Sequence, residues 1–365
     1  MFFFWGILAA LISFALSFWL RSFSLKRNIA MARVRDRDVH ATPTPRLGGV
    51  AIVGSFLIVM ILIAIFAGRQ ASDFGFPFAV YGLSIDKRLL GILLASVFIS
   101  LVMLKDDLKS VPAIWKFLSQ IAAGLILIVS GIGIVYLNNP FGLAINLDTV
   151  KIPVQIGASV YHLVFWADLL LLIWVSLIMN ATNFIDGLDG LAGAISLISG
   201  LILLVLSLSV SQGATALLAA VFVGAIIGFL PFNLPKAKLF LGDTGSMFLG
   251  LMLAVLSLIS GGKLATLLLV FGLVILNALY VVVKRTIQGL NPMTNPDQTH
   301  LHHRFLQAGF SPTSTLILIS SFSLAFGLAG ILTGGQLKIY LVVALAIISI
   351  LMFVVLDLRA KKTAV

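Results

Sequence analysis

Long apolar runs separated by short polar segments are the feature that most constrains this 365-residue chain. A hydrocarbon core about 30 Å thick needs roughly 20 helical residues to cross it. Because lipid offers the backbone no hydrogen-bond partner, each run is predicted to be an α-helix. The first run lacks a preceding basic segment and a clear cleavage site, which favours a span over a cleaved signal. Eleven runs are predicted, at residues 2–20, 48–67, 89–104, 114–137, 160–179, 191–210, 215–232, 246–260, 264–283, 314–333 and 339–356.

The composition excludes several classes of protein. Hydrophobic residues make up 60% of the chain and charged residues 10%, against about 25% charged in ordinary soluble domains. A soluble enzyme, a disordered chain and a nucleic-acid-binding domain are therefore excluded, although the net charge is +11. We expect an all-α, polytopic integral membrane protein that forms a single transmembrane domain over residues 1–365. Cysteine and glutamate are both absent, so any carboxylate chemistry must use aspartate.

The distribution of basic residues predicts the orientation in the membrane. The face reached after the first run would carry 18 of the 24 Lys and Arg residues, and the opposite face the other six. Cytoplasmic loops of membrane proteins carry an excess of Lys and Arg. We therefore expect a multi-pass protein of the plasma or inner membrane, with the N-terminus outside and the C-terminus in the cytoplasm.

Four short polar motifs interrupt the apolar pattern. Each follows an odd-numbered run, so in an alternating topology all four emerge on the face predicted to be cytoplasmic. They hold five of the 13 aspartates and three of the five histidines. The motifs are KDDL at 105–108, the segment 180–192, LGDTGS at 241–246 and HLHHR at 300–304.

The first motif contains two adjacent carboxylates, Asp106 and Asp107. At about 4 Å and an effective dielectric constant near 20, two like charges repel each other by roughly 4 kcal/mol. Such a pair favours a compensating cation, and the alternative is an ordinary solvated helix end. Lys116, ten residues after Asp106, could contact a phosphate or the carboxylates, or could be a positive-inside anchor.

The second and third motifs combine acidic side chains with glycine. Asn183, Asp186 and Asp189 recur every three residues, a spacing that places them on one face of a helical turn. Asp243 follows a glycine at a predicted loop-to-helix junction, where a single carboxylate suits Mg²⁺. The alternative for Asp189 and Asp243 is helix capping.

The fourth motif places His302 and His303 next to Arg304. Phosphate binding by these side chains is favoured over a zinc site, because consecutive histidines diverge on a regular helix. A bland polar loop is the remaining alternative. Asp168, inside the fifth predicted span, is left without a role.

Together these motifs predict a membrane-level site in which aspartates, Mg²⁺ and basic groups bind phosphates for phosphoryl transfer. No Walker-type loop is present, so an ATP-driven P-loop enzyme is excluded. A site at the lipid boundary indicates that one substrate is a lipid phosphate. A transporter is the rival from another class, but transporters tend to place charges near the membrane midplane on broken helices.

The combined motifs resemble those of the polyprenyl-phosphate N-acetylhexosamine-1-phosphate transferases. The matching residues are PRLGG at 45–49, Asp106-Asp107, NFIDGLDGLAG at 183–193, FLGDTGSMFLG at 240–250 and HLHHR at 300–304. The resemblance implies ten or eleven helices around a cytoplasmic cleft. It also implies Mg²⁺-dependent transfer of a HexNAc-1-phosphate from a UDP-sugar to undecaprenyl phosphate, with Mn²⁺ as a substitute metal. The expected partners are these two substrates and membrane lipid but no nucleic acid, and a homodimer is left open.

The resemblance also implies roles for individual residues. Asp243 is similar to the family's metal ligand, with Asn183 beside it. The candidate catalytic residues are Asp106, Asp107, Asp186, His302 and His303. The candidate substrate-binding residues are Lys116, Asn180, Asn183, Asp189 and Arg304.

The HLHHR motif is more similar to the GlcNAc branch of the family than to the branch that transfers phospho-MurNAc-pentapeptide, which remains the alternative. One departure is Asn277, where many relatives have aspartate. Asn277 carries no negative charge, so the substrate contact made at that position in relatives is in doubt here.

Overall fold

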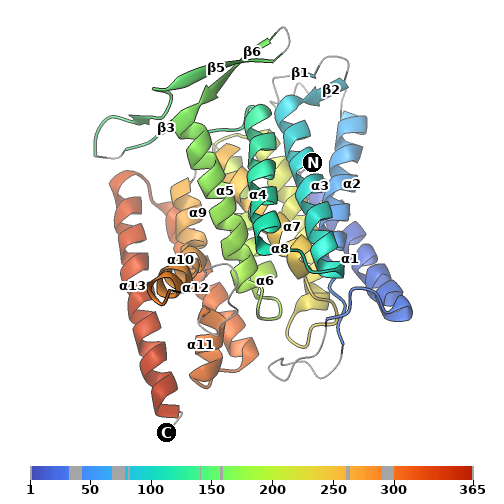
Figure 1. Cartoon of the computed structure of the whole chain (residues 1–365), viewed down its shortest axis with the longest axis vertical. Helices are drawn as coiled ribbons and strands as arrows, with labels where there is room; N and C mark the ends of the chain where they lie inside the picture. The colour runs from blue at the N-terminus through green and yellow to red at the C-terminus, as the bar shows by residue number, and fades with distance from the viewer. Residues whose placement is uncertain are drawn as a thin grey trace.

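The computed structural model describes residues 2–32, 43–67, 79–80, 83–139, 141–156, 159–259, 264–289 and 300–363. These residues form a bundle of long helices with short hairpins at one end (Figure 1). The helices are α1 (Phe2–Arg27), α2 (Gly48–Ala67), α3 (Lys87–Leu108), α4 (Ala113–Val129), α5 (Phe165–Ile185), α6 (Leu191–Ser209), α7 (Gly213–Asn233), α8 (Gly242–Ile259), α9 (Leu264–Val270), α10 (Gly272–Ile287), α11 (Leu301–Gln307), α12 (Pro312–Leu332) and α13 (Gly335–Thr363).

The helical membrane architecture predicted from the apolar runs is confirmed. Nine helices of the described residues are long and apolar enough to cross a membrane. The predicted run 264–283 is a broken pair, because α9 and α10 are bent by 79° at a short break. The run predicted at 114–137 contains α4, which has only 17 residues.

The predicted bounds of two spans are wrong, and the error at the end of α5 affects the site. α4 ends at Val129 rather than at 137. The chain then turns through Gly131, which has a φ of +81°. α5 begins at Phe165 rather than at 160 and continues to Ile185. Asn180 and Asn183 therefore lie on the last turns of a helix, not in a loop after it.

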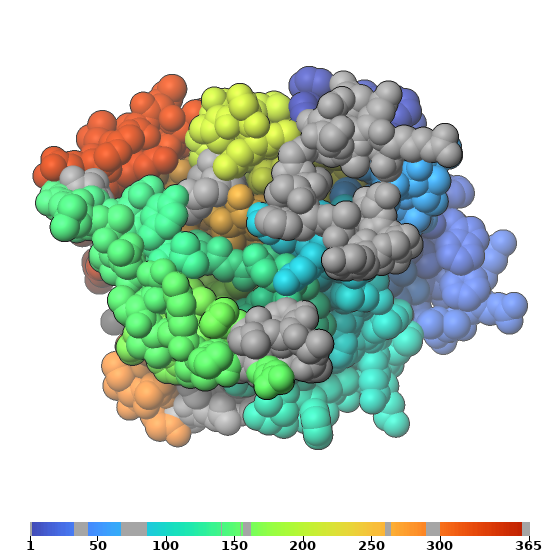
Figure 2. All heavy atoms as spheres, turned by 90° about the horizontal axis from the view of Figure 1, so that it is seen from above, coloured from blue at the N-terminus to red at the C-terminus, as the bar shows by residue number. Residues whose placement is uncertain are grey.

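Three two-stranded antiparallel hairpins lie at the end of the bundle opposite α11 (Figure 1). They pair β1 (Ala79–Val80) with β2 (Leu83–Asp86), β3 (Tyr136–Leu137) with β4 (Ile145–Asn146), and β5 (Lys151–Ile156) with β6 (Ser159–Val164). Seen from this end, the green segment that includes β3 to β6 spreads over part of the helical bundle (Figure 2). The apolar-run analysis did not anticipate these strands.

The core lies around α7 and α8, the most buried of the candidate spans. Small residues allow α1 to approach α7 closely: a Cβ at Gly224 would lie 2.0 Å from the Gly6 carbonyl oxygen, and one at Gly228 2.1 Å from that of Ala10. Such close backbone contact is a common way for helices to associate in lipid. α8 packs against α2, α3, α5 and α6, which bury most of its residues.

Backbone hydrogen bonds join the PRLGG segment to the start of α8. The Phe240 N–H donates to the Pro45 carbonyl (2.7 Å), and the Gly48 and Gly49 N–H groups donate to the carbonyls of Phe240 (2.9 Å) and Leu241 (2.8 Å). A Cβ at Gly49 would lie 2.1 Å from the Gly245 nitrogen. The glycines of both motifs are therefore needed for the contact between the first turns of α2 and α8.

Candidate active site

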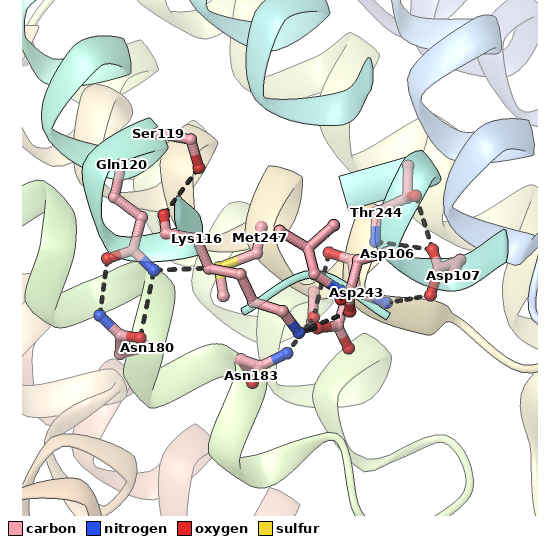
Figure 3. Close-up of polar contacts among 12 residues, drawn as sticks. Asp106, Asp107, Lys116, Ser119, Gln120, Asn180, Asn183, Asp243, Thr244 and Met247 are labelled. Atoms are coloured by element: carbon pink, nitrogen blue, oxygen red, sulfur yellow. Dashed lines mark hydrogen bonds and ion pairs between the residues drawn. The ribbon is translucent and has the colours of Figure 1, made fainter. Parts of the chain in front are cut away.

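Lys116 lies at the centre of a cluster drawn from three helices (Figure 3). Its Nζ is 2.5 Å from Asp106 Oδ2, at the end of α3, and 2.6 Å from Asp243 Oδ2, in the first turn of α8. All three side chains are partly buried. Of the partners considered for Lys116 from the sequence, the structure shows the carboxylates. A cation between two carboxylates offsets their mutual repulsion.

Asp107 points away from Lys116 and holds the N-terminus of α8. Its carboxylate accepts hydrogen bonds from the backbone N–H groups of Asp243 (2.8 Å) and Thr244 (3.0 Å) and from the Thr244 hydroxyl (2.6 Å). The first N–H groups of a helix have no partner within the helix, and a carboxylate there also interacts favourably with the helix dipole. Asp107 thus fixes the backbone that carries Asp243.

The last turns of α5 carry two asparagines with different partners. Asn183 donates from Nδ2 to Ser246 Oγ on α8 (2.9 Å), three residues after Asp243. Asn180, one turn away, exchanges hydrogen bonds with Gln120 on α4 (2.8 and 3.2 Å). Asn183 therefore lies at the carboxylates, whereas Asn180 joins α4 to α5.

The turn between α5 and α6 carries Asp186 and Asp189 in different roles. Burial, followed by repulsion from Asp243 and Asp107, raises the pKa of Asp186 well above 3.8, while Arg46 acts in the opposite direction. Asp186 is therefore part of the same charged cluster. The Asp189 carboxylate accepts a hydrogen bond from the Ala237 N–H (3.0 Å) and so ties this turn to the connection between α7 and α8.

His302 reaches the same turn from α11. Its side chain is 1% exposed, and neither ring nitrogen has a hydrogen-bond partner among the described residues. Burial, with smaller effects of His303 and His300, lowers the pKa of His302 well below 6.5, so the ring is neutral. A Cβ at Gly187 would lie 2.3 Å from His302 Nε2. The glycine after Asp186 therefore makes room for this imidazole.

His303 lies beside His302, whereas Arg304 extends away from the turn. The His303 ring lies 4.3 Å from that of His302, measured between centroids. The Arg304 guanidinium carbon is 4.3 Å from the centre of the Tyr280 ring, and Nη1 is 3.1 Å from Asp357 Oδ1. The structure thus brings His302 to Gly187 but directs Arg304 toward α10 and α13.

Three further residues have structural or electrostatic roles that the sequence did not predict. Arg46 acts electrostatically on Asp186, and the PRLGG motif was the only signal for it. Gln120 holds Asn180, one turn of α4 after Lys116. Asp168 accepts a hydrogen bond from the Val164 N–H (2.8 Å) at the start of α5, which gives this unassigned carboxylate a capping role.

The donor set suits Mg²⁺ better than zinc. No group of three His or Asp side chains in the described part of the chain is arranged to hold a metal ion. Mg²⁺ needs only one or two carboxylates, because water and substrate phosphates complete its coordination. Asp106 and Asp243 converge on one point, now filled by the Lys116 ammonium, which is a position that favours positive charge.

The fold and the site together define an integral membrane enzyme with a carboxylate-rich site for phosphate-bearing substrates. The chain belongs to glycosyl transferase family 4, whose family model matches residues 89–261. A decaprenyl-phosphate N-acetylglucosaminephosphotransferase of Mycolicibacterium smegmatis is 33% identical over 339 residues, which cover 86% of this chain and 77% of the relative.

Two further relatives extend the comparison to both branches of the family. A probable undecaprenyl-phosphate N-acetylglucosaminyl 1-phosphate transferase of Bacillus subtilis is 29% identical, over 83% of this chain and 76% of the relative. A phospho-N-acetylmuramoyl-pentapeptide-transferase of Staphylococcus saprophyticus is 28% identical, over 80% of this chain and 86% of the relative. The family resemblance inferred from the motifs is therefore confirmed.

Proposed function

We propose that this protein transfers GlcNAc-1-phosphate from UDP-GlcNAc to a polyprenyl phosphate, undecaprenyl phosphate in the first instance, and releases UMP. The observation that carries the proposal is the Lys116 cluster, in which side chains from α3, α4 and α8 converge. The turn between α5 and α6, which His302 contacts at Gly187, carries Asp186 of the same charged group. The name of the 33%-identical relative specifies the same sugar. The product would serve envelope polysaccharide synthesis as its first membrane-bound intermediate.

The reaction is proposed as direct attack. An oxygen of the lipid phosphate bonds to the phosphorus that carries the sugar. The bond from that phosphorus to the bridging oxygen breaks, and UMP leaves with that oxygen. A phosphate dianion needs positioning more than activation, so no covalent aspartyl intermediate is invoked.

Lys116 and the histidines are assigned to the phosphates. The Lys116 ammonium, held between Asp106 and Asp243, would turn toward an incoming phosphate oxygen and neutralise its charge. Neutral His302 would donate one ring N–H to a phosphate or sugar oxygen, since the protein supplies no other partner within the described residues. His303 would contribute from the adjacent position.

The remaining residues are assigned to the metal and to positioning. Asp243, with Asn183 beside it, would hold Mg²⁺, which supplies positive charge to the pyrophosphate when bound. Asp186 would remain within electrostatic reach of the same ion. Asp107 would act through the backbone of α8, and Asp106 through Lys116.

The site is further proposed to face the cytoplasm, where UDP-sugars are made. The positive-inside distribution of Lys and Arg supports this orientation. In this orientation the hairpins would lie outside the cell and the C-terminus inside it.

The test is turnover of purified full-length protein with undecaprenyl phosphate, Mg²⁺ and one UDP-sugar at a time. UMP release with UDP-GlcNAc, together with a lipid product that carries the sugar and two phosphates, is the expected result. Preference for UDP-MurNAc-pentapeptide would move the protein to the other branch of the family. The absence of UMP with every UDP-HexNAc would favour a transporter and overturn the proposal.

A further inference from the structure

α11 is a short helix of seven residues that carries His302 and His303. Figure 1 shows it beside the C-terminal half of α13, at the end of the bundle away from the hairpins. His302 has no hydrogen bond of its own to the described residues. The position of its imidazole therefore depends on how α11 as a whole is held.

Asn277 on α10 holds the first residue of α11. Its Oδ1 accepts the Leu301 backbone N–H at 2.9 Å, and both residues are at most 1% exposed. The Asn277 Nδ2 has no hydrogen-bond partner among the described residues. Asn277 thus serves as a hydrogen-bond acceptor. An aspartate at this position could accept the same bond, so the contact does not require a negative charge.

Arg304 holds the middle of α11 against α10 and α13. Its guanidinium carbon lies 4.3 Å from the centre of the Tyr280 ring on α10 and 5.4 Å from that of Phe353 on α13. Asp357, one turn after Phe353, pairs with Nη1 at 3.1 Å, and the Arg304 side chain is only 5% exposed. An arginine enclosed in this way would have to leave two aromatic rings and a carboxylate to reach a substrate phosphate.

A second contact joins the end of α13 to the segment that follows α11. The guanidinium carbon of Arg359 lies 4.9 Å from the centre of the Phe310 ring. Phe310 in turn packs edge-on against Phe305 of α11, with ring centroids 5.3 Å apart. The C-terminal part of α13 therefore braces α11 at two places.

We propose that Arg304 and Asn277 are positioning residues that fix His302 and His303 at the active site, and that the C-terminal part of α13 is the brace. The expected change in kcat rests on the proposed function. The expected contacts that hold α11 do not. It replaces the expectation, drawn from the HLHHR motif, that Arg304 contacts a phosphate.

Asp357→Asn is the discriminating variant, because Asp357 is an anion and cannot itself bind phosphate. If α11 is braced, Asp357→Asn and Arg304→Gln should both lower kcat, by about 10-fold and about 100-fold respectively, since small displacements of a catalytic group are costly. KM for UDP-GlcNAc should change by less than about threefold, because neither Arg304 nor Asp357 itself contacts the substrate in this proposal. A KM increase confined to Arg304→Gln, with Asp357→Asn unchanged, would establish a phosphate contact and overturn the brace.

Asn277 offers a rescue by a conservative variant. Asn277→Asp keeps an oxygen acceptor for the Leu301 N–H and should retain most of the turnover. Asn277→Leu has a similar volume but no acceptor, and should lose about 10-fold or more in kcat. Equal losses in the two variants would contradict the assigned role of Oδ1.

The matched control is Lys284→Gln, which removes another cation near the same Tyr280 ring (5.9 Å), but one that lies on α10 itself rather than on α11. It should leave both kinetic constants unchanged. If Arg304→Gln fails to fold, judged by its unfolding temperature in detergent, Phe353→Leu and Asp357→Asn still test the brace.

A readout independent of turnover separates this inference from the proposed function. Diethyl pyrocarbonate should modify the buried His302 slowly in the native protein. In Arg304→Gln and Asp357→Asn the modification should be at least about fivefold faster, measured by mass spectrometry, because local opening exposes the ring. An unchanged rate in both variants would overturn the brace even if the enzyme is active, and a wild-type protein without turnover would overturn only the proposed function.

Discussion

Charge balance governs the individual side chains around Lys116. One ammonium serves both Asp106 and Asp243, while burial, followed by repulsion from Asp243 and Asp107, raises the pKa of Asp186. The negative charge of the carboxylates in this cluster exceeds the positive charge of the Lys116 ammonium, so the cluster favours the binding of a further cation. This imbalance is what a magnesium-dependent phosphate site requires, because carboxylates alone would repel the substrate.

Replacement of the proposed metal ligand should abolish turnover. We expect Asp243→Asn to lower kcat by at least about 100-fold, because even residues that only support a metal ligand cost 10- to 100-fold when lost. UMP release measures the effect, and the amount of protein in the membrane fraction shows whether insertion is normal. Asp168→Asn, at the other end of α5, is the control and should retain turnover. Full activity of Asp243→Asn would remove the metal assignment.

Asp186→Asn should stabilise the metal-free protein while it impairs turnover. The pKa of Asp186 is raised above 3.8, so the ionised form destabilises the folded state, and this cost grows as the pH rises from about 4. At pH 8 the variant should unfold at a temperature higher by about 2 °C or more, and the gain should vanish toward pH 4.

The comparison for Asp186→Asn is Asp189→Asn. Asp189 accepts a hydrogen bond from the Ala237 N–H, and its replacement weakens that bond while it relieves only the smallest of the repulsions that act on Asp186. It should therefore lower the unfolding temperature at pH 8. A decrease for Asp186→Asn at pH 8 would mean that its carboxylate is stabilised in the folded protein, contrary to the charges around it.

At the level of helices, the ends rather than the middles carry the chemistry. Asp106 and Asp107 lie in the last turn of α3, Asn183 in the last turn of α5, and Asp243 in the first turn of α8. Asp107 gives the α8 terminus hydrogen-bond acceptors on α3, which fixes one helix end on another. A helix end held in this way keeps its side chains in place without a long loop.

The sequence predicted the helices and the grouping of the motifs well, because hydropathy and loop charge depend on local composition. It did not distinguish the residues within a motif. Asp106 and Asp107 are adjacent, yet one carboxylate binds Lys116 and the other caps α8. Arg304 follows His303 directly, yet it packs between aromatic rings. Such differences depend on the rotation of each helix about its axis, which tertiary contacts set.

Gly187→Ala should interfere with the contact between the α5–α6 turn and α11. The added methyl group would lie 2.3 Å from His302 Nε2, so the imidazole must move. We expect kcat to fall by about 10-fold or more, since a displacement of the order of 1 Å is costly for a catalytic group. Steady-state UMP release provides the measurement.

The control for Gly187→Ala is Gly133→Ala, because a Cβ at Gly133 would meet nothing within 4 Å. Gly133→Ala should have wild-type kinetics and an unchanged unfolding temperature. If Gly187→Ala also keeps wild-type turnover, His302 does not need its observed position, and its assignment to the substrate fails.

The whole molecule is polarised along the bundle axis. The hairpins lie at one end, and α11 lies at the other (Figure 1). The basic segments predicted to face the cytoplasm belong to the same face as the four motifs. One orientation therefore satisfies both the charge rule and the need of the proposed reaction for a cytoplasmic sugar nucleotide.

Single-cysteine labelling can test this orientation cleanly, because the native chain has no cysteine. Leu143, between β3 and β4, is 92% exposed, and Lys238, between α7 and α8, is exposed on the site face. In right-side-out membrane vesicles, a thiol reagent that cannot cross the membrane should label Leu143→Cys at once. It should label Lys238→Cys only after detergent is added. The reverse pattern would place the carboxylate cluster outside the cell, away from the supply of UDP-sugars, and the proposed reaction would lose its substrate.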